Sequence, residues 1–343
     1  MRQHEITQGH PLLNEQGQVI ESGYAKTLIL DYHRLQVKAS RFRIKEWDYY
    51  FIGSDDYGIS VTIADLSYIG LVGVTFFQFK EKKKFSYSDF RLFPMGKFQL
   101  PHSSQRGDIS YRSKKITLDI KVTESLRTIY CHIPRFHNGK SLTLDVLLTD
   151  PPRDSMVIVT PFKEDPRAFY YNQKLNNLSV TGEIHFGHQV YDLSKKQAVL
   201  DWGRGVWTYD NTWYWSSLSD YLPDGSKFGF NLGYGFGDTS KATENMIFYQ
   251  GVAHKLEEID FGIPQVDGQD DFLSPWHFTS SDGRFEASFE PIYDNYTNIN
   301  FIFIQHLAHQ VFGYFSGYAI LDDGKKITFN RLFGFAEKVR NRW

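Results

Sequence analysis

The feature that most constrains this chain is the recurrence of glycine-containing turn dipeptides between apolar runs. These dipeptides are Asn138-Gly139, Asp224-Gly225, Asp282-Gly283 and Asp323-Gly324. Asparagine or aspartate followed by glycine supplies the positive φ angles that a tight β-hairpin turn requires. The dipeptides therefore predict that the runs on either side are antiparallel strands joined by short hairpins.

The apolar runs have the two-residue period of β-strands. Residues 115–122 and 141–148 alternate between apolar and polar side chains, which is typical of strands with one buried face. Residues 47–52 and 59–63 flank turn residues at 53–58 and predict a further hairpin. Long windows with apolar residues at helical spacing are scarce. We therefore predict an all-β chain of curved antiparallel sheets, barrels or sandwiches with few short helices.

Two polar, proline-containing breaks divide the chain near its midpoint, at 150–152 and at 163–167. The 343 residues exceed the length of one typical domain, about 100–200 residues. We expect an N-terminal β domain over 1–165 and a C-terminal β domain over 166–343.

The overall charge and the rarity of cysteine exclude several classes of protein. Lysine and arginine total 38 against 40 aspartates and glutamates, so we expect no nucleic-acid partner. The single cysteine, Cys131, rules out an intramolecular disulfide. The first 17 residues lack the continuous apolar stretch of a secretory signal, and residues 68–79 are too short to span a bilayer as a helix. We expect a cytoplasmic protein without a membrane span.

Two histidine pairs are candidate metal ligands, His185 with His188 and His306 with His309. A spacing of three places the two rings on opposite faces of a strand, and no cysteine cluster accompanies them. We expect neither a metal site nor another cofactor.

The aromatic content of 17% is concentrated, because four of the seven tryptophans lie between 202 and 215. In an extended backbone, five side chains of this stretch point to one side. They are Asp201, Trp207, Tyr209, Trp213 and Trp215. This face predicts a cavity wall that carries one carboxylate, unless a bend at 203–205 or a turn at 210–211 changes the register. The alternative is a tryptophan-rich core in which Asp201 bonds to backbone amides.

A second unusual face follows in residues 228–237, where glycines alternate with aromatic side chains. The glycines are Gly229, Gly233, Gly235 and Gly237. A glycine face in a strand indicates that a backbone, a bulky side chain or a ligand approaches closely. Close packing within a barrel is the alternative interpretation.

Glu244 and Asn245 stand at the start of the next apolar strand, where a polar group could face a cavity mouth. Asp201 and Glu244 are the candidate catalytic pair, because carboxyl groups in unequal environments separate into an acid and a base. The alternative is that Arg204 or Lys255 pairs with them structurally. The residues expected to contact a ligand are Trp202, Arg204, Trp207, Tyr209, Trp213, Trp215, Asn231, Tyr234 and Asn245.

Several long motifs carry a family resemblance. Residues 45–50, 170–176, 201–215 and 243–245, together with the opening 11–17, resemble the domain-of-unknown-function 2804 family over nearly the whole chain. That family has no activity to carry over to this sequence.

Residues 182–203 are more distantly similar to lipocalin-like (calycin) two-barrel proteins, such as carotenoid hydratases, tocopherol-cyclase-like proteins and some pericyclases. In those proteins an acidic residue with tryptophan and glycine follows a β-hairpin. Here Asp201 directly precedes Trp202-Gly203, with no histidine between them. The resemblance implies two curved antiparallel barrels with a ligand cavity in or between them.

Three functions fit these features. The first is an enzyme that acts on a largely apolar small molecule by hydratase, cyclase or isomerase type acid catalysis, with aromatic rings facing the developing cation. The second is a non-enzymatic carrier of a lipid or other hydrophobic ligand. The third is a glycoside hydrolase or carbohydrate-binding protein that uses Asp201 and Glu244. The distant resemblance places the hydrophobic-ligand functions first.

Overall fold

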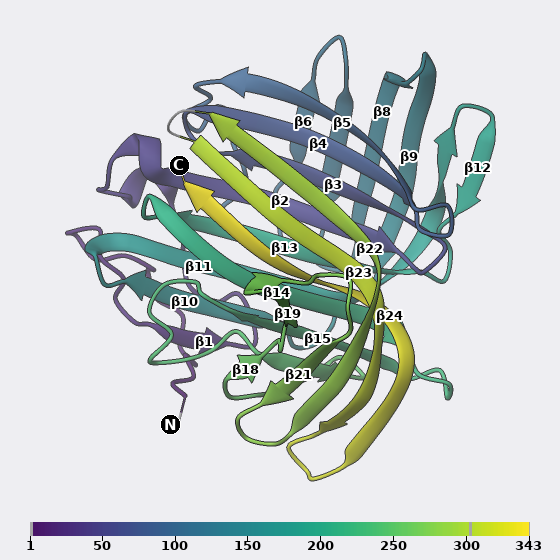
Figure 1. Ribbon diagram of the computed structural model, residues 1–343. Helices are drawn as coiled ribbons and strands as arrows, with labels where there is room; N and C mark the ends of the chain where they lie inside the picture. The colour runs from purple at the N-terminus through teal and green to yellow at the C-terminus, as the bar shows by residue number, and fades with distance from the viewer. Residues whose placement is uncertain (1–2, 302–303, 343) are drawn as a thin grey trace.

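The computed structural model describes residues 3–301 and 304–342, and it consists of two large, strongly curled antiparallel sheets (Figure 1). The only helices in this described part are two short 3-10 turns, η1 (Arg34–Gln36) and η2 (Arg41–Arg43). The predicted all-β fold of two curved antiparallel sheets is confirmed.

The first sheet contains strands from both sides of the midpoint of the chain. Its ten principal strands are β2 (Ile44–Gly53), β3 (Tyr57–Asp65), β4 (Ile69–Gln78), β5 (Lys83–Leu92), β6 (Ile109–Arg112), β7 (Thr117–Val122), β8 (Arg127–His137), β9 (Lys140–Thr149), β11 (Asp165–Phe186) and β13 (Gln197–Val206). Their order across the sheet is β5-β4-β3-β2-β13-β11-β9-β8-β7-β6. The shorter strands β1 (Gly23–Ala25), β10 (Met156–Phe162) and β12 (Gln189–Asp192) attach through β11. Strands β11 and β13 therefore complete a sheet that the first 150 residues begin.

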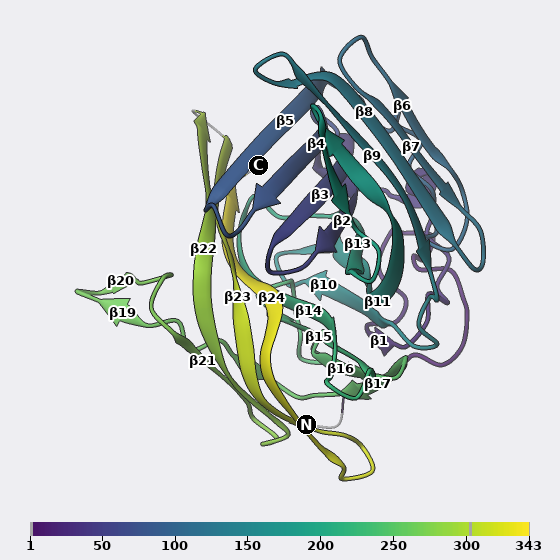
Figure 2. The same cartoon turned by 90° about the vertical axis from the view of Figure 1, so that its right-hand side faces the viewer.

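The second sheet is built from the remainder of the chain. Its strands are β14 (Asp210–Tyr221), β15 (Lys227–Tyr234), β16 (Met246–Tyr249), β17 (Val252–Lys255), β18 (Ile259–Asp260), β21 (Trp276–Ser280), β22 (Phe285–Phe301), β23 (Ile304–Ile320) and β24 (Lys326–Arg342). They are ordered β17-β16-β15-β14-β24-β23-β22-β21-β18. Strands β19 (Gln265–Val266) and β20 (Gln269–Asp270) form a separate small hairpin, which projects from the body of the molecule (Figure 2).

The predicted hairpins are confirmed. The four turn dipeptides connect β8 to β9, β14 to β15, β21 to β22 and β23 to β24. Their glycines, Gly139, Gly225, Gly283 and Gly324, have φ angles between 68° and 83°. The predicted turn at 53–58 joins β2 to β3.

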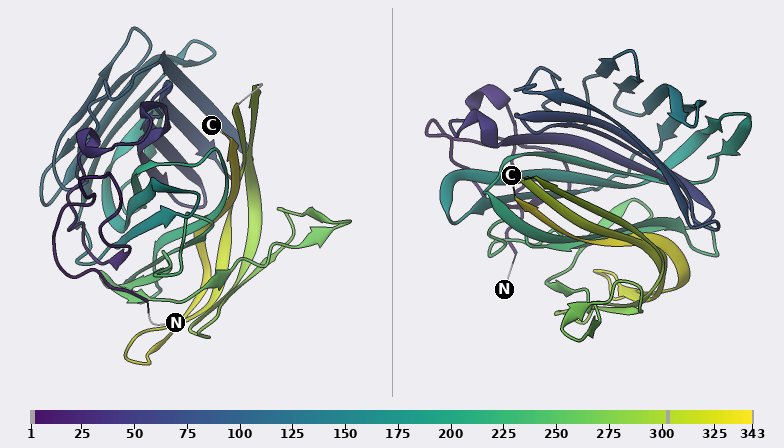
Figure 3. Two further views of the ribbon diagram at one scale, coloured as in Figure 1. Left: turned by 90° about the vertical axis from the view of Figure 1, so that its left-hand side faces the viewer. Right: turned by 45° about the horizontal axis from the view of Figure 1, so that its top comes forward.

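The two sheets pack against each other through one face each, as the right-hand view of Figure 3 shows. One apolar cluster lies mainly within the first sheet and a second lies within the second sheet. A third cluster joins them and is almost wholly aromatic. Its buried members are Phe51, Phe77, Phe79 and Val199 from the first sheet, and Trp215, Phe312, Phe333 and Phe335 from the second. The contact between the two sheets is therefore a separate hydrophobic core. It includes the face of β13 that carries Val199 and Asp201.

Gly203 in β13 leaves no room for a side chain, because the Trp47 indole packs against its Cα. A Cβ atom on Gly203 would lie 2.1 Å from Cζ2 of Trp47 on the neighbouring strand β2. Strand β13 runs without a break through Gly203 and Gly205, so no bend changes its register there.

Replacement of Gly203 by alanine is expected to lower the free energy of unfolding by about 1–3 kcal/mol, because the Trp47 indole must move to admit the methyl group. Urea unfolding followed by circular dichroism measures this loss. Gly73→Ala in β4 is the matched control, since the nearest atom to its added Cβ is Ser88 Oγ at 3.6 Å. Equal losses in the two variants would contradict the expected clash.

Candidate functional site

A buried ion pair lies on the face of the first sheet that meets the second sheet. Lys174 of β11 and Asp201 of β13 are directly opposed in the antiparallel register. Lys174 Nζ lies 2.8 Å from Asp201 Oδ2, and the two side chains are 1% and 11% exposed. Asn172 Nδ2 donates to Asp201 Oδ1 at 2.6 Å. The Lys174 ammonium also lies 3.8 Å from the ring centroid of Trp215, so it is held from both sheets.

Two glutamates from the second half of the chain surround this pair. Burial raises the pKa of Glu244 to about 7, and the Lys174 ammonium partly opposes that shift. Burial likewise raises the pKa of Glu337 to about 7, again opposed by Lys174. The Asp201 carboxylate raises both pKa values further. We call Lys174, Asp201, Glu244 and Glu337 the carboxyl cluster. Because the desolvation of these two carboxyl groups outweighs the attraction of Lys174, both glutamates keep their protons up to about neutral pH.

Glu244 has few polar partners for so deeply buried a group. Among residues 3–301 and 304–342, neither of its carboxyl oxygens has a hydrogen-bond partner of good geometry. The Asn231 side chain lies close enough to lower the pKa of Glu244 somewhat. That amide donates to the Glu244 backbone carbonyl at 2.8 Å and accepts from Trp215 Nε1 at 2.7 Å. An unpartnered buried carboxyl group is costly, and this cost makes it a candidate for function.

The glycine face of β15 provides the space for Glu244. A Cβ atom on Gly233 would lie 2.5 Å from Glu244 Oε1. The Gly233 amide donates to Asn245 Oδ1 at 2.7 Å, which fixes the segment that carries Glu244. The group that the sequence predicts close to this glycine face is therefore the Glu244 carboxyl group at Gly233. The Asn177 side chain is the group that lies close to Gly229.

Glu337 is bound more fully than Glu244. Its Oε1 accepts from Trp213 Nε1 at 3.3 Å, and its Oε2 accepts from Gln310 Nε2 at 3.3 Å. Gln310 Nε2 also donates to the Tyr49 hydroxyl at 3.2 Å. Glu337 is therefore better suited to a supporting role than to direct proton transfer.

An aromatic cluster adjoins the carboxyl cluster. It consists of Trp47, Tyr170, Trp207, Trp213 and Phe236, whose rings make stacked, tilted and edge contacts. Tyr170 stacks on Phe236 with centroids 4.6 Å apart, and its buried hydroxyl has no hydrogen-bond partner in the described part of the chain. The carboxyl groups of Glu244, Asp201 and Glu337 all act on the pKa of Tyr170, which burial raises well above its usual range. Tyr170 thus connects the two clusters.

The structure brings together several of the residues expected from the alternation of 201–215. Asp201, Trp207, Trp213 and Trp215 lie in or beside the two clusters. Tyr209 does not, because it lies between β13 and β14 and is 53% exposed.

Other expected ligand contacts lie elsewhere. Trp202 and Arg204 alternate with Asp201 on β13 and point away from the second sheet. Arg204 lies over the Trp202 ring at 4.3 Å and pairs with Asp48 at 3.0 Å. Tyr234 stacks on Tyr214 with centroids 4.3 Å apart, on the face of β15 opposite Gly233.

Sequence reasoning missed Lys174 and Glu337. Lys174 is the single charge of 168–178, a segment that is almost wholly buried, and Glu337 stands beside Lys338 in 332–339, which is mostly buried. That pattern was the available signal, since isolated charges in such segments are rarely buried without a partner.

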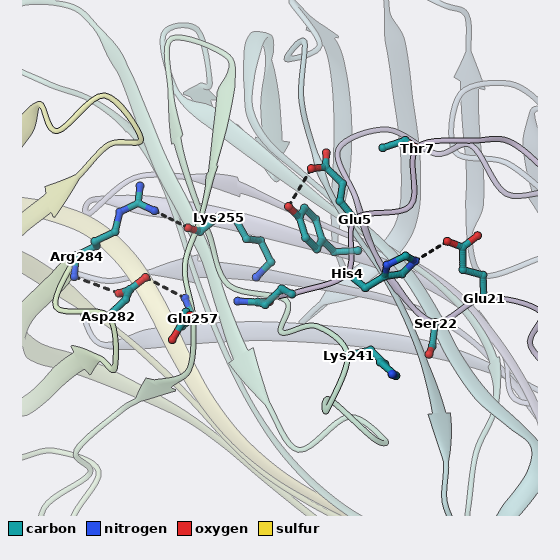
Figure 4. Close-up of a pocket in the computed structure, with 12 residues that line it drawn as sticks. His4, Glu5, Thr7, Glu21, Ser22, Lys241, Lys255, Glu257, Asp282 and Arg284 are labelled. Carbon is teal, nitrogen blue, oxygen red and sulfur yellow. Dashed lines mark hydrogen bonds and ion pairs between the residues drawn. The ribbon is translucent and has the colours of Figure 1, made fainter. Parts of the chain in front are cut away.

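A large cleft lies next to this site but has different chemistry. It has a volume of about 1150 Å³ and is lined mainly by polar and charged residues (Figure 4). Figure 4 shows Arg284, Asp282 and Glu257 at one end and His4 with Glu21 at the other. The described residues that line this cleft include no member of the carboxyl cluster.

Lys255 connects this cleft with Glu244. Its ammonium donates to Thr243 Oγ1, to the Asn245 carbonyl and to the Leu256 carbonyl at 2.6–3.0 Å. Burial lowers the pKa of Lys255 well below its usual range, and the Glu244 carboxyl opposes that shift. Lys255 therefore lines the cleft and also lies close enough to Glu244 for the two charges to interact.

The described part of the chain, 3–301 and 304–342, contains no group of three or more histidine, cysteine, aspartate or glutamate side chains arranged to hold a metal ion. His185 contacts Glu183, and His309 contacts Asp294.

The described residues 3–301 and 304–342 include no helix that is long and apolar enough to cross a membrane.

Two solved structures are similar to this chain in fold. An AttH-like protein of Nitrosomonas europaea is 12% identical, with a TM-score of 0.50 over 90% of this chain and 96% of that chain. Kievitone hydratase of Nectria haematococca is 11% identical, with a TM-score of 0.51 over 87% of this chain and 88% of that chain. At these identities the similarity shows the fold alone.

No curated protein matches this sequence. The model of a family described as a domain of unknown function, DUF2804, matches residues 3–343. The predicted family resemblance is therefore confirmed, and this chain belongs to the DUF2804 family.

Proposed function

We propose that the protein is an enzyme that acts on a largely apolar small molecule by acid catalysis, with Glu244 as the proton donor. The observation that carries this proposal is the state of Glu244, a buried carboxyl group with a pKa of about 7 and no well-placed hydrogen-bond partner among the described residues. A carboxylic acid that keeps its proton near neutral pH can transfer it to a weakly basic carbon or oxygen of a substrate.

The surrounding groups support a reaction in which positive charge develops. The Asp201 carboxylate, oriented by Lys174 and Asn172, can stabilise a cation or accept a proton from it. The rings of Tyr170, Trp207 and Trp213 supply the π faces that attract a cation. The fold similarity to kievitone hydratase is compatible with the addition of water to such a substrate.

Access to Glu244 requires side-chain movement, because this residue is only 3% exposed. Trp47 and Trp213 are the half-buried members of the aromatic cluster, so it reaches the surface there. We infer that a substrate enters when the Trp213 indole rotates and gives up its 3.3 Å bond to Glu337.

The two alternative functions fit less well. A carrier needs aromatic walls, but it gains nothing from three carboxyl groups around one lysine, two of them buried, an arrangement that is costly to desolvate. A glycosidase needs two carboxyl groups at the floor of an open groove. Here both Asp201 and Glu244 are buried, so neither carboxyl group lies at the floor of an open groove.

A screen of apolar unsaturated and hydroxylated small molecules tests the proposal, with liquid chromatography and mass spectrometry to detect isomerisation or the gain of water. We expect turnover to fall as pH rises through about 7, since Glu244 then loses its proton. Glu244→Gln and Asp201→Asn should abolish turnover, while Glu244→Gln still binds the substrate in a thermal-shift assay. The exposed Glu258→Gln is the control.

Wild-type turnover by Glu244→Gln would exclude Glu244 as the acid. A lipid-sized ligand retained in native mass spectrometry, together with no conversion of any compound, would favour the carrier instead.

A further inference from the structure

One rim of the first sheet combines exposed apolar side chains with a local excess of positive charge. Four large apolar residues are more than half exposed there: Leu35 at 93%, Phe42 at 55%, Leu92 at 78% and Phe93 at 56%. Residues 34–45 and 91–106 contain eight lysines and arginines and no aspartate or glutamate. The whole chain has a net charge of −2, so this charge is localised.

Hydrogen bonds place these two segments side by side around the turn between β3 and β4. The Phe93 and Met95 amides donate to the Tyr68 and Ser67 carbonyls at 2.9 and 3.2 Å. Lys45 Nζ donates to the carbonyls of Phe42 and Leu66 at 3.1 and 3.0 Å. Both η1 and η2 lie beside this end of the first sheet in Figure 1. The apolar and basic side chains therefore belong to one surface.

The nearby acidic groups are already engaged. Glu46 and Asp65 pair with Arg34, and Asp165 pairs with Arg43. In contrast, the exposed Lys38, Arg41 and Lys97 form no ion pair with any residue of the described chain. We call Leu35, Lys38, Arg41, Phe42, Leu92, Phe93 and Lys97 the basic rim.

The loop that follows β5 holds part of this rim in an unfavourable backbone conformation. Phe93, Met95 and Gln99 have φ angles of 50° to 51°, a region that bulky residues rarely adopt. The loop borders a cleft of about 410 Å³ whose lining includes three bases, Arg91, Lys97 and Arg112. Backbone strain that keeps an aromatic ring in solvent beside cationic groups points to an external partner.

We propose that the basic rim docks on the surface of an anionic lipid membrane, with Leu35, Phe42, Leu92 and Phe93 entering the headgroup region. Charge complementarity selects this partner, because basic residues beside exposed apolar side chains bind anionic headgroups and the acyl boundary together. A second copy of the chain would bring the same positive charges together and is disfavoured. This docking does not depend on the proposed acid catalysis.

Co-sedimentation of the full chain with two kinds of vesicle tests the proposal. We expect binding to vesicles of equal parts phosphatidylcholine and phosphatidylglycerol to exceed binding to phosphatidylcholine alone by at least about tenfold, and to weaken as salt is raised. The variant Lys38→Glu/Arg41→Glu/Lys97→Glu should lose at least about tenfold in binding to the anionic vesicles. The variant Leu35→Ser/Phe42→Ser/Leu92→Ser/Phe93→Ser should also bind more weakly.

The matched control is Lys80→Glu/Lys82→Glu/Lys83→Glu, which makes the same change in net charge at the turn between β4 and β5, at the opposite end of β5. This control should bind as the wild type does. Equal binding to both vesicle types, or equal losses in the control and the rim charge variant, would overturn the proposal. A dimer that only the serine variant dissociates, without vesicle binding by the wild type, would also overturn it in favour of self-association. Circular dichroism verifies that each variant is folded.

Discussion

Replacing Lys174 by methionine is expected to lower the free energy of unfolding by about 3–5 kcal/mol at pH 8. The substitution leaves the 11% exposed Asp201 carboxylate without its ammonium partner, and an unpaired buried charge is far more costly than an absent pair. The loss should be smaller at pH 5, where more of the carboxyl cluster is neutral. Guanidinium unfolding at the two pH values measures the effect.

Two further variants identify its cause. Lys196→Met removes a lysine whose Nζ lies 3.0 Å from Asp56 Oδ1, but those side chains are 20% and 28% exposed. Its loss should therefore be below about 1 kcal/mol. Adding Asp201→Asn to Lys174→Met should restore much of the lost stability, because it removes the unpaired charge. If Lys174→Met cost no more than Lys196→Met, the buried pair would not have the energetic role that we assign to it.

Glu244→Gln is expected to make the protein more stable at pH 8 by up to about 3 kcal/mol. In the unfolded chain this carboxyl ionises near pH 4.5, and in the folded protein near pH 7. Between these values the folded state holds a proton that the unfolded state has released, so the free energy of unfolding falls as pH rises and is level above about 7. Glutamine does not ionise, so the variant does not lose this stability as pH rises. The shift of the Glu244 pKa from 4.5 to about 7 corresponds to about 3 kcal/mol.

The pH dependence distinguishes this effect from ordinary changes in packing. Unfolding curves of wild type and variant should differ little at pH 4, diverge between pH 5 and pH 7, and remain separated at pH 8. The exposed Glu258→Gln should follow the wild type throughout. A stability difference that stays constant from pH 4 to pH 8 would show that Glu244 does not hold a proton near neutrality. A gain in stability together with a loss of turnover is the pattern expected of a strained catalytic group.

Much of the candidate site could be located from the sequence, but its composition could not. Asp201 lies together with Trp207, Trp213 and Trp215 as expected, but Trp213 and Trp215 belong to β14 and reach this site because the two sheets meet there. The alternation of 201–215 failed for Tyr209, because the chain turns between β13 and β14 as it passes from one sheet to the other. Period-two reasoning holds only while the strand continues.

The partners of Asp201 depend on contacts between distant parts of the chain. Lys174 faces Asp201 because β11 pairs with β13, and Glu337 arrives on β24, which pairs with β14 in the other sheet. These pairings follow from the order of strands and from the packing of two curled sheets. Neither is encoded in the pattern of a single segment.

The sequence by itself determined the strands, the hairpins and the family, because turn chemistry and the two-residue period act between near neighbours and long motifs are specific. The tertiary structure decided which charges share one buried space. Desolvation and mutual repulsion of three carboxyl groups around Lys174 arise only when the two sheets meet, and they raise the pKa of Glu244 and Glu337 to about 7.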